Sequence, residues 1–343
     1  MQLRRLAVVT SAALLTPLAL TACGSPGGGG GADGHVQVLA SFYPLQFVAE
    51  QVGGDLVDVE NLTPAAADPH DLELSPARAR EIGSADVVVY LSGLQPAVDD
   101  AIAQRAPANL VDAADHVKLL SASVTGGDQA EEHDHEDAHD ADHADDADGH
   151  DHADDADADA DEHDHDMGGN DPHFWLDPTL LAQVADPVAD ALAKADPDNA
   201  ETFHANAADL VERLGALDQE MAAGLASFAG ATLITNHTAF GYLAQRYGLE
   251  QVGITGLDHD TEPSPARLRE IGQIARDHHV STLFYETLVS PRVVQTLATD
   301  QGLQSAVIDT LEGLDPEHDK AGDDYISIMR RNLQTLQEGL VAP

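Results

Sequence analysis

Short apolar runs alternate with amphipathic segments along most of the chain. Runs of strand length occupy residues 36–40, 57–62, 87–91 and 110–111, and a second set occupies 232–235, 251–254, 282–285 and 306–308. Helix-like segments separate many of these runs, at 75–83, 94–105, 239–247, 264–278 and 291–300. Strands that alternate with helices indicate βα units and parallel sheets. The pattern therefore predicts an α/β protein with two lobes.

A nine-residue fragment occurs once in each set of elements. Residues 75–83 read SPARAREIG and residues 264–272 read SPARLREIG, so they differ at one position. A serine followed by proline is a good helix start, because serine caps the helix and proline suits its first turn. Two helices could share this start by chance, but the match equally favours a pseudo-duplicated pair of lobes.

The segment between the two sets is rich in Ala, Leu, Asp and Glu and has a helical period. Its prolines at 187 and 197 predict breaks in the helix. From residue 198 onward, apolar residues recur at spacings of three, four or seven residues, as on one face of a helix: Phe203, Leu210, Leu214, Leu217 and Met221. We predict one long, rigid helix that crosses from lobe to lobe and restricts lobe closure.

The first 35 residues are typical of an exported lipoprotein. Arg4 and Arg5 precede an apolar run of 15 residues, and Leu-Thr-Ala-Cys at 20–23 resembles the bacterial lipoprotein box. A membrane-spanning helix would need about 20 apolar residues. We therefore expect Cys23 to carry the lipid and the glycine-rich stretch after it to be a flexible tether. The protein would be anchored on the outer face of the cell membrane.

These features together predict the domain organisation. It comprises a signal peptide (1–22), a tether (23–35), an N-terminal α/β lobe (36–179), a linker helix region (180–229) and a C-terminal α/β lobe (230–343).

Charge is distributed unevenly between the lobes and one insert. The formal net charge of −45 argues against nucleic-acid binding, because a phosphate backbone would be repelled. Residues 128–166 hold 20 of the 61 acidic residues and no basic residue, which leaves −25 for the rest of the chain. The single cysteine excludes an internal disulfide and a multi-thiolate zinc site.

The insert at 128–166 also differs in composition, and it should be disordered because it lacks large apolar residues. It could be a solvated acidic linker. Its closely spaced histidines favour weak, exchangeable sites for zinc or similar ions instead. These histidines are His133, His135, His139, His143, His150, His152, His163 and His165.

Three other histidines follow strands or turns at the predicted mouth of a lobe. His70 and His173 each stand in an Asp-Pro-His sequence, and His237 follows the first strand of the second set. Ligands of open α/β sheets bind at the carboxyl ends of strands. His70 and His237 could therefore face each other across a cleft.

At these residues the chain resembles the metal-specific solute-binding lipoproteins of bacterial ABC importers, of the zinc/manganese class. The matching elements occur in family order at 68–74 (DPHDLEL), 171–178 (DPHFWLDP), 236–242 (NHTAFGY), 285–292 (YETLVSPR) and 322–329 (GDDYISIM). The resemblance implies two (β/α) lobes joined by a long rigid helix, with one metal ion in the cleft between them.

Carried over residue by residue, the resemblance implies that His70, His173 and His237 are metal ligands. The fourth is the acidic residue of the last motif, either Asp323 or Asp324, and the usual spacing before Tyr325 favours Asp323. Three imidazoles and one carboxylate suit Zn2+ better than Mn2+.

The resemblance further implies a monomeric binding protein that captures Zn2+ and delivers it to an ABC permease. A manganese-selective relative and a metal-binding surface adhesin are alternatives. A zinc hydrolase is disfavoured, because the fourth protein ligand fills the position that a reactive water needs. We therefore expect a transport protein and not an enzyme.

The remaining residues of interest receive structural roles. Glu286 is expected beside a ligand rather than on the metal, Trp175 is expected to pack the ligand loop, and His259 could line the rim of the cleft. The other histidines are expected at the surface: His35, His116, His204, His278, His279 and His318.

Overall fold

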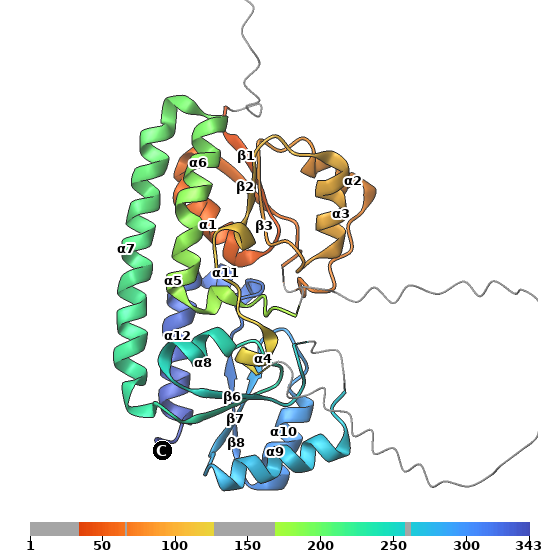
Figure 1. Ribbon diagram of the computed structural model, residues 1–343, viewed down its shortest axis with the longest axis vertical. Coiled ribbons are helices and arrows are strands. Elements are labelled where there is room, and N and C mark those ends of the chain that lie inside the picture. Colours follow the sequence, from red (N-terminus) through yellow and green to blue (C-terminus); the bar gives the residue numbers. More distant parts are fainter. Residues whose placement is uncertain (1–33, 66, 127–168, 258–261) are drawn as a thin grey trace, which may run out of the picture.

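The computed structural model describes residues 34–65, 67–126, 169–257 and 262–343. Two α/β lobes lie one above the other along the long axis of the molecule, and the long helix α7 (Ala200–Leu225) runs along one side of both (Figure 1). The predicted fold class, two lobes with parallel sheets and a long connecting helix, is confirmed.

The N-terminal lobe is built on one parallel sheet with strand order β2-β1-β3-β4. Its strands are β1 (Val36–Ala40), β2 (Val57–Asn61), β3 (Val87–Tyr90) and β4 (Leu110–Asp112). Its helices are α1 (Tyr43–Gly53), α2 (Pro76–Ile82) and α3 (Pro96–Arg105). The central strand β3 is buried throughout, as expected for a parallel strand covered on both faces.

The C-terminal lobe contains two parallel strand pairs, β5-β6 and β7-β8, and β7 packs beside β5. The strands are β5 (Thr232–Thr235), β6 (Glu250–Gly253), β7 (Thr282–Glu286) and β8 (Gln304–Ile308). The helices are α8 (Gly241–Tyr247), α9 (Pro265–Asp277), α10 (Arg292–Gln301), α11 (Pro316–Ala321) and α12 (Tyr325–Gly339).

The connection between the lobes is more elaborate than the single predicted helix. Short helices α4 (Ala122–Thr125) and α5 (Pro178–Leu181) precede α6 (Ala185–Ala195), which packs along α7. The chain reverses at the predicted break at Pro197, whereas Pro187 lies in the first turn of α6, where it breaks nothing. Short 3₁₀ turns lie at Gly54–Leu56, Ala113–Asp115, Phe174–Leu176, Ala182–Val184, Pro197–Asn199 and Ala226–Phe228.

Helix α7 has 26 residues and is therefore about 39 Å long. Its predicted apolar face is buried, and α1 of one lobe and α12 of the other both pack against it. Arg213 on α7 donates to Gln51 of α1 at 2.6 Å and lies 3.8 Å from Asp324 at the start of α12. The helix thus contacts both lobes, as the prediction of a crossover requires.

The repeated fragment makes equivalent contacts in the two lobes. Ser75 and Ser264 each cap their helix by accepting from the backbone N–H of the arginine three residues later. Those arginines, Arg78 and Arg267, reach back to the carbonyl of the last residue of the neighbouring strand, Asn61 and Gly253 respectively. The same sequence thus performs the same structural task twice, which favours pseudo-duplication over chance.

The largest cluster of buried apolar residues is continuous from the N-terminal sheet through α6 and α7 to α12. Two smaller clusters lie under α2 and α3 and under α9 and α10. Within the described residues, no helix combines the length and the apolar character that crossing a membrane requires.

Candidate metal centre

Two of the predicted histidines are positioned by the same local structure. In each Asp-Pro-His sequence the aspartate accepts the backbone N–H of the histidine two residues later, at 2.7 Å for Asp68 and His70 and at 2.9 Å for Asp171 and His173. This turn is favoured by aspartate because its short side chain reaches its own backbone two residues on. The third histidine, His237, lies two residues after the end of β5.

A carboxylate lies at the centre of the three histidines. Oε1 of Glu312 is 3.6 Å from Nε2 of His70, 3.1 Å from Nε2 of His173 and 3.6 Å from Nε2 of His237. The ring centroids of His70 and His237 lie 5.4 Å and 5.3 Å from that of His173. The structure thus brings all three predicted histidines together, from both lobes.

These distances match the edges of a small coordination polyhedron. Ligand atoms about 2.0–2.2 Å from a tetrahedral zinc ion lie about 3.3–3.6 Å from one another. His173, His237 and Glu312 are buried, whereas His70 has 23% of its side chain exposed and forms the open side of the cluster. Among the described residues, the group of His70, His173 and Glu312 is the one with at least three mutually close ligand atoms.

Two of the rings are backed by buried carboxylates. Nδ1 of His173 lies 2.7 Å from Asp171, and Nδ1 of His237 lies 2.7 Å from Glu286. A carboxylate accepts, so each Nδ1 carries a proton, and Nε2, which faces Glu312, is the ring nitrogen that a metal ion can take once it is deprotonated. This is the arrangement that orients metal-binding histidines and raises their basicity. Glu286 therefore occupies the supporting position expected for it.

Burial and charge act in opposite directions on these groups. Burial lowers the pKa of His237, but Glu286 and Glu312 outweigh it and hold the pKa well above its ordinary value of 6.5. Burial also lowers the pKa of His173, and Asp171 and Glu312 reverse that effect. Burial raises the pKa of Glu312, but hydrogen bonding to the histidines holds it well below its ordinary value. The cluster therefore favours positive charge next to Glu312.

Glu312 lies in a tightly held loop after β8. Leu311 has a left-handed φ of 60°, and its backbone N–H donates to Asp309 at 2.7 Å. The Asn332 side chain in turn accepts from the backbone N–H of Asp309 and donates to its backbone carbonyl. Trp175, next to His173, donates its indole N–H to the carbonyl of Thr310 at 2.8 Å. Trp175 thus ties one ligand loop to another, in keeping with the packing role predicted for it.

The two candidates for the fourth predicted ligand, Asp323 and Asp324, have partners in α12. Asp323 accepts from Arg331 at 2.7 Å, and Asp324 caps α12 by accepting from Ser327 at 2.8 Å. The carboxylate that lies within 4 Å of all three histidine Nε2 atoms is that of Glu312. Their motif matched the family by sequence, but its acids serve the start of a helix, and Glu312 supplies the carboxylate beside the histidines.

The sequence contained a signal for Glu312 that the motif comparison passed over. Asp309 and Glu312 follow the apolar run of β8, as His237 follows β5. The rule that places ligands at the carboxyl ends of parallel strands applies to both.

Most of the remaining histidines lie where they were expected. Four of them are exposed: His116, His204, His278 and His279. His35 and His318 are half-buried, and His318 accepts a hydrogen bond from Arg331 at 2.9 Å. Cys23, His259 and all eight histidines of the insert lie outside the described residues.

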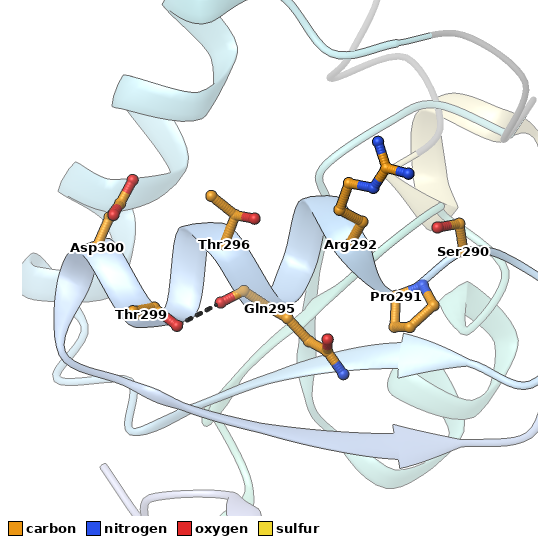
Figure 2. A pocket seen from close by; sticks show the side chains of 7 residues that line it. All are labelled: Ser290, Pro291, Arg292, Gln295, Thr296, Thr299 and Asp300. Atoms are coloured by element: carbon orange, nitrogen blue, oxygen red, sulfur yellow. Dashed lines mark hydrogen bonds between the residues drawn. The ribbon is translucent and has the colours of Figure 1, made fainter.

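The C-terminal lobe also has an open surface pocket of about 390 Å³ along α10, drawn in Figure 2. Its described lining residues are Ser290, Pro291, Arg292, Gln295, Thr296, Thr299 and Asp300. Asp300 is the single lining residue with a carboxylate, and none is a histidine, so this pocket lacks the donors of a second zinc site.

Comparison with known proteins agrees with this chemistry. Residues 38–339 match the family model "Zinc-uptake complex component A periplasmic". The chain is 34% identical over 313 residues to the zinc-binding lipoprotein AdcA of Streptococcus pneumoniae, covering 90% of this chain and 56% of AdcA. The chain thus spans little more than half the length of that relative. It is also 34% identical over 331 residues to the high-affinity zinc uptake system protein ZnuA of Bacillus subtilis, covering 94% of each.

Solved structures show the same fold. The metal-dependent lipoprotein YcdH of B. subtilis superposes with a TM-score of 0.69 at 30% identity, covering 89% of this chain and 99% of YcdH. The Zn(II)-bound ZnuA-like domain of S. pneumoniae AdcA superposes with a TM-score of 0.67 at 30% identity, covering 89% of this chain and 99% of that domain.

Proposed function

This chain belongs to the family of A components of zinc-uptake complexes, and on that premise we propose that it captures Zn2+ outside the cytoplasmic membrane and delivers the ion to the permease of an ABC importer. The family is one of binding proteins and not of enzymes. Zinc is the cargo, and the protein's task is to bind it selectively and to release it at the permease.

The observation that carries this proposal is the convergence of three Nε2 atoms on one carboxylate oxygen. We propose His70, His173, His237 and Glu312 as the ligands of one tight zinc site. Three imidazoles and one carboxylate favour zinc, whereas manganese prefers carboxylate, carbonyl and water. Four protein ligands also fill a tetrahedral site, which leaves no position for the reactive water of a hydrolase.

The site is suited to capture and release. Three ligands are buried and pre-positioned, while the partly exposed His70 gives the ion access from solvent. Because the ligands come from both lobes, a shift of one lobe against the other would separate them. This coupling supports delivery to a partner rather than permanent retention.

We further propose that a lipid on Cys23 anchors a monomeric protein to the membrane. The lipoprotein box at 20–23 supports the anchor, and AdcA of S. pneumoniae is named a lipoprotein. Labelling cells with a clickable palmitate analogue tests it: the Cys23→Ala variant should lose the label that the unchanged chain carries.

The test of zinc capture compares two carboxylate substitutions in the mature protein. Glu312→Gln removes the charged oxygen that faces the three imidazoles, so zinc affinity measured by chelator competition should fall at least about tenfold. Asp323→Asn is the matched control and should leave the affinity unchanged. An affinity lost in the Asp323 variant and kept in the Glu312 variant would reject this ligand set, and the absence of tight zinc binding in the unchanged protein would reject the function.

A further inference from the structure

The two oxygens of Glu312 have different surroundings. Oε1 faces the three histidine Nε2 atoms, at 3.1 Å to 3.6 Å. Oε2 accepts a hydrogen bond from the hydroxyl of Thr310 at 3.1 Å. Both side chains are buried, with 3% and 1% of the residues exposed. One oxygen is thus directed at the ion position and the other at a hydroxyl.

Thr310 cannot easily follow a movement of the carboxylate. Its carbonyl accepts from the indole of Trp175 at 2.8 Å. Asp309, which precedes it, holds the left-handed Leu311 that follows it through a 2.7 Å hydrogen bond. A non-glycine residue at positive φ persists where the surroundings fix it. The hydroxyl therefore acts as a fixed donor on a rigid turn.

A fixed donor on Oε2 restricts how Glu312 can bind a metal. A bidentate carboxylate must turn both oxygens toward the ion, and this rotation would break the hydrogen bond to Thr310 and leave a buried hydroxyl without it. Bidentate carboxylates are characteristic of larger, oxygen-rich coordination shells, whereas zinc takes four ligands in a tetrahedron. Manganese is likewise suited by oxygen-rich, octahedral shells.

We propose that Thr310 is a specificity-determining positioning residue: by holding Oε2 it keeps Glu312 monodentate and so favours four-coordinate zinc over manganese. This inference rests on the proposed function of the same site. It assigns a role to a residue that itself touches no metal ion, and it explains how one carboxylate can be used without opening the site to ions that prefer more oxygen ligands.

The test pairs Thr310→Val, which removes the hydroxyl and keeps the branched shape, with Thr310→Ser, which keeps the hydroxyl. Each protein is loaded with Co2+ as a visible substitute for zinc, because four-coordinate cobalt absorbs more strongly than five- or six-coordinate cobalt. The valine variant should show weakened absorption, and its zinc-to-manganese affinity ratio should fall about tenfold or more. The serine variant should retain the spectrum and the ratio of the unchanged protein.

A valine variant with an unchanged cobalt spectrum and an unchanged affinity ratio would overturn the inference while leaving zinc capture intact. If that variant fails to fold, X-ray absorption at the zinc edge of the unchanged protein decides. Four nitrogen or oxygen ligands at about 2.0–2.2 Å support the inference, and a five-coordinate ion overturns it. An unchanged protein that binds no zinc tightly would reject the proposed function itself, and this inference with it.

Discussion

Glu286, the last residue of β7, hydrogen-bonds both the ring and the backbone of His237. Its Oε2 lies 2.7 Å from Nδ1 of the imidazole, and its Oε1 accepts the backbone N–H of the same residue at 3.1 Å. Both residues are buried. The two contacts fix the tautomer and the orientation of the ring, so that Nε2 points toward Glu312.

Replacing Glu286 with glutamine should weaken zinc binding without touching a ligand. An amide offers one accepting oxygen where the carboxylate offers two, so its NH2 group would face a donor of His237 and the ring would lose its fixed orientation. Loss of such a supporting partner typically costs about 10–100-fold in metal affinity. Chelator competition with the zinc-loaded protein measures the effect.

The matched control is Glu338→Gln, an exposed glutamate on α12 that makes one hydrogen bond to Gln334. It should bind zinc as the unchanged protein does. Equal affinities for the two glutamine variants would mean that the Glu286 contact contributes nothing to the site.

Zinc affinity should fall as the pH is lowered, beginning above pH 6.5. Zinc binds neutral imidazole, so protons compete with it. Although burial lowers the pKa values of His173 and His237, their carboxylate partners leave both values raised, so protons compete at a higher pH than they would at an ordinary histidine. For each proton that zinc must displace, the zinc affinity should fall about tenfold per unit decrease in pH. Competition titrations between pH 8 and 6 measure the slope.

The zinc-free protein should show the opposite trend from the same groups. A raised pKa in the folded state gives stability that is fully present below the unfolded-state pKa, near 6.5, and is lost as the pH rises through the folded-state value. Thermal unfolding of the two forms across this range separates the effects. A zinc affinity that is constant from pH 8 to 6 would show that these imidazoles are not the ligands.

The strands and most of the helices between them can be predicted from the sequence, because neighbouring residues are enough to determine each of them. Buried parallel strands give continuous apolar runs, and serine followed by proline starts α2 and α9. Helices α1 and α12 were not predicted, since their burial depends on packing against α7, a contact distant in sequence. The reversal between α6 and α7 likewise needs the tertiary contact between those helices.

The site divides in the same way. The Asp-Pro-His turns positioned His70 and His173 locally, so the sequence identified them. The proposed fourth ligand depends on which loop reaches the histidines, and the motif match indicated Asp323 or Asp324 without considering Glu312. The loop of Glu312 is held by Trp175, 135 residues away in the chain, and no local pattern reports such a contact.

Deleting residues 128–166 should remove weak zinc sites and retain the tight one. The chain on either side of this insert is already joined: Ser121 forms an antiparallel bridge with Asn170, and the backbone N–H of Asp171 donates to Leu120 at 2.8 Å. A short Gly/Ser linker should therefore close the gap without disturbing the loop of His173. Calorimetry with a competing chelator should show one tight ion in both proteins and several weak ions only in the full chain.

If the deletion abolished the tight site, the assignment of that site to the lobes would be wrong. If the full chain showed no weak ions, the insert would be an acidic linker and not a metal collector. A scrambled insert of equal charge without histidines is the control that separates charge from imidazole.

Gly241 and Gly215 should respond in opposite directions to substitution with alanine. A Cβ atom at Gly241, the first residue of α8, would lie 2.3 Å from Cβ of Thr125 and 2.9 Å from its carbonyl oxygen, where α4 packs on α8. Overpacking of this kind costs about 1–3 kcal/mol. At Gly215, inside α7, a Cβ atom would meet nothing within 4 Å, so Gly215→Ala should add about 0.5–1 kcal/mol through helix propensity. Denaturant unfolding of the two metal-free variants measures both changes, and a Gly241→Ala protein as stable as the unchanged chain would show that α4 does not pack closely on α8 in solution.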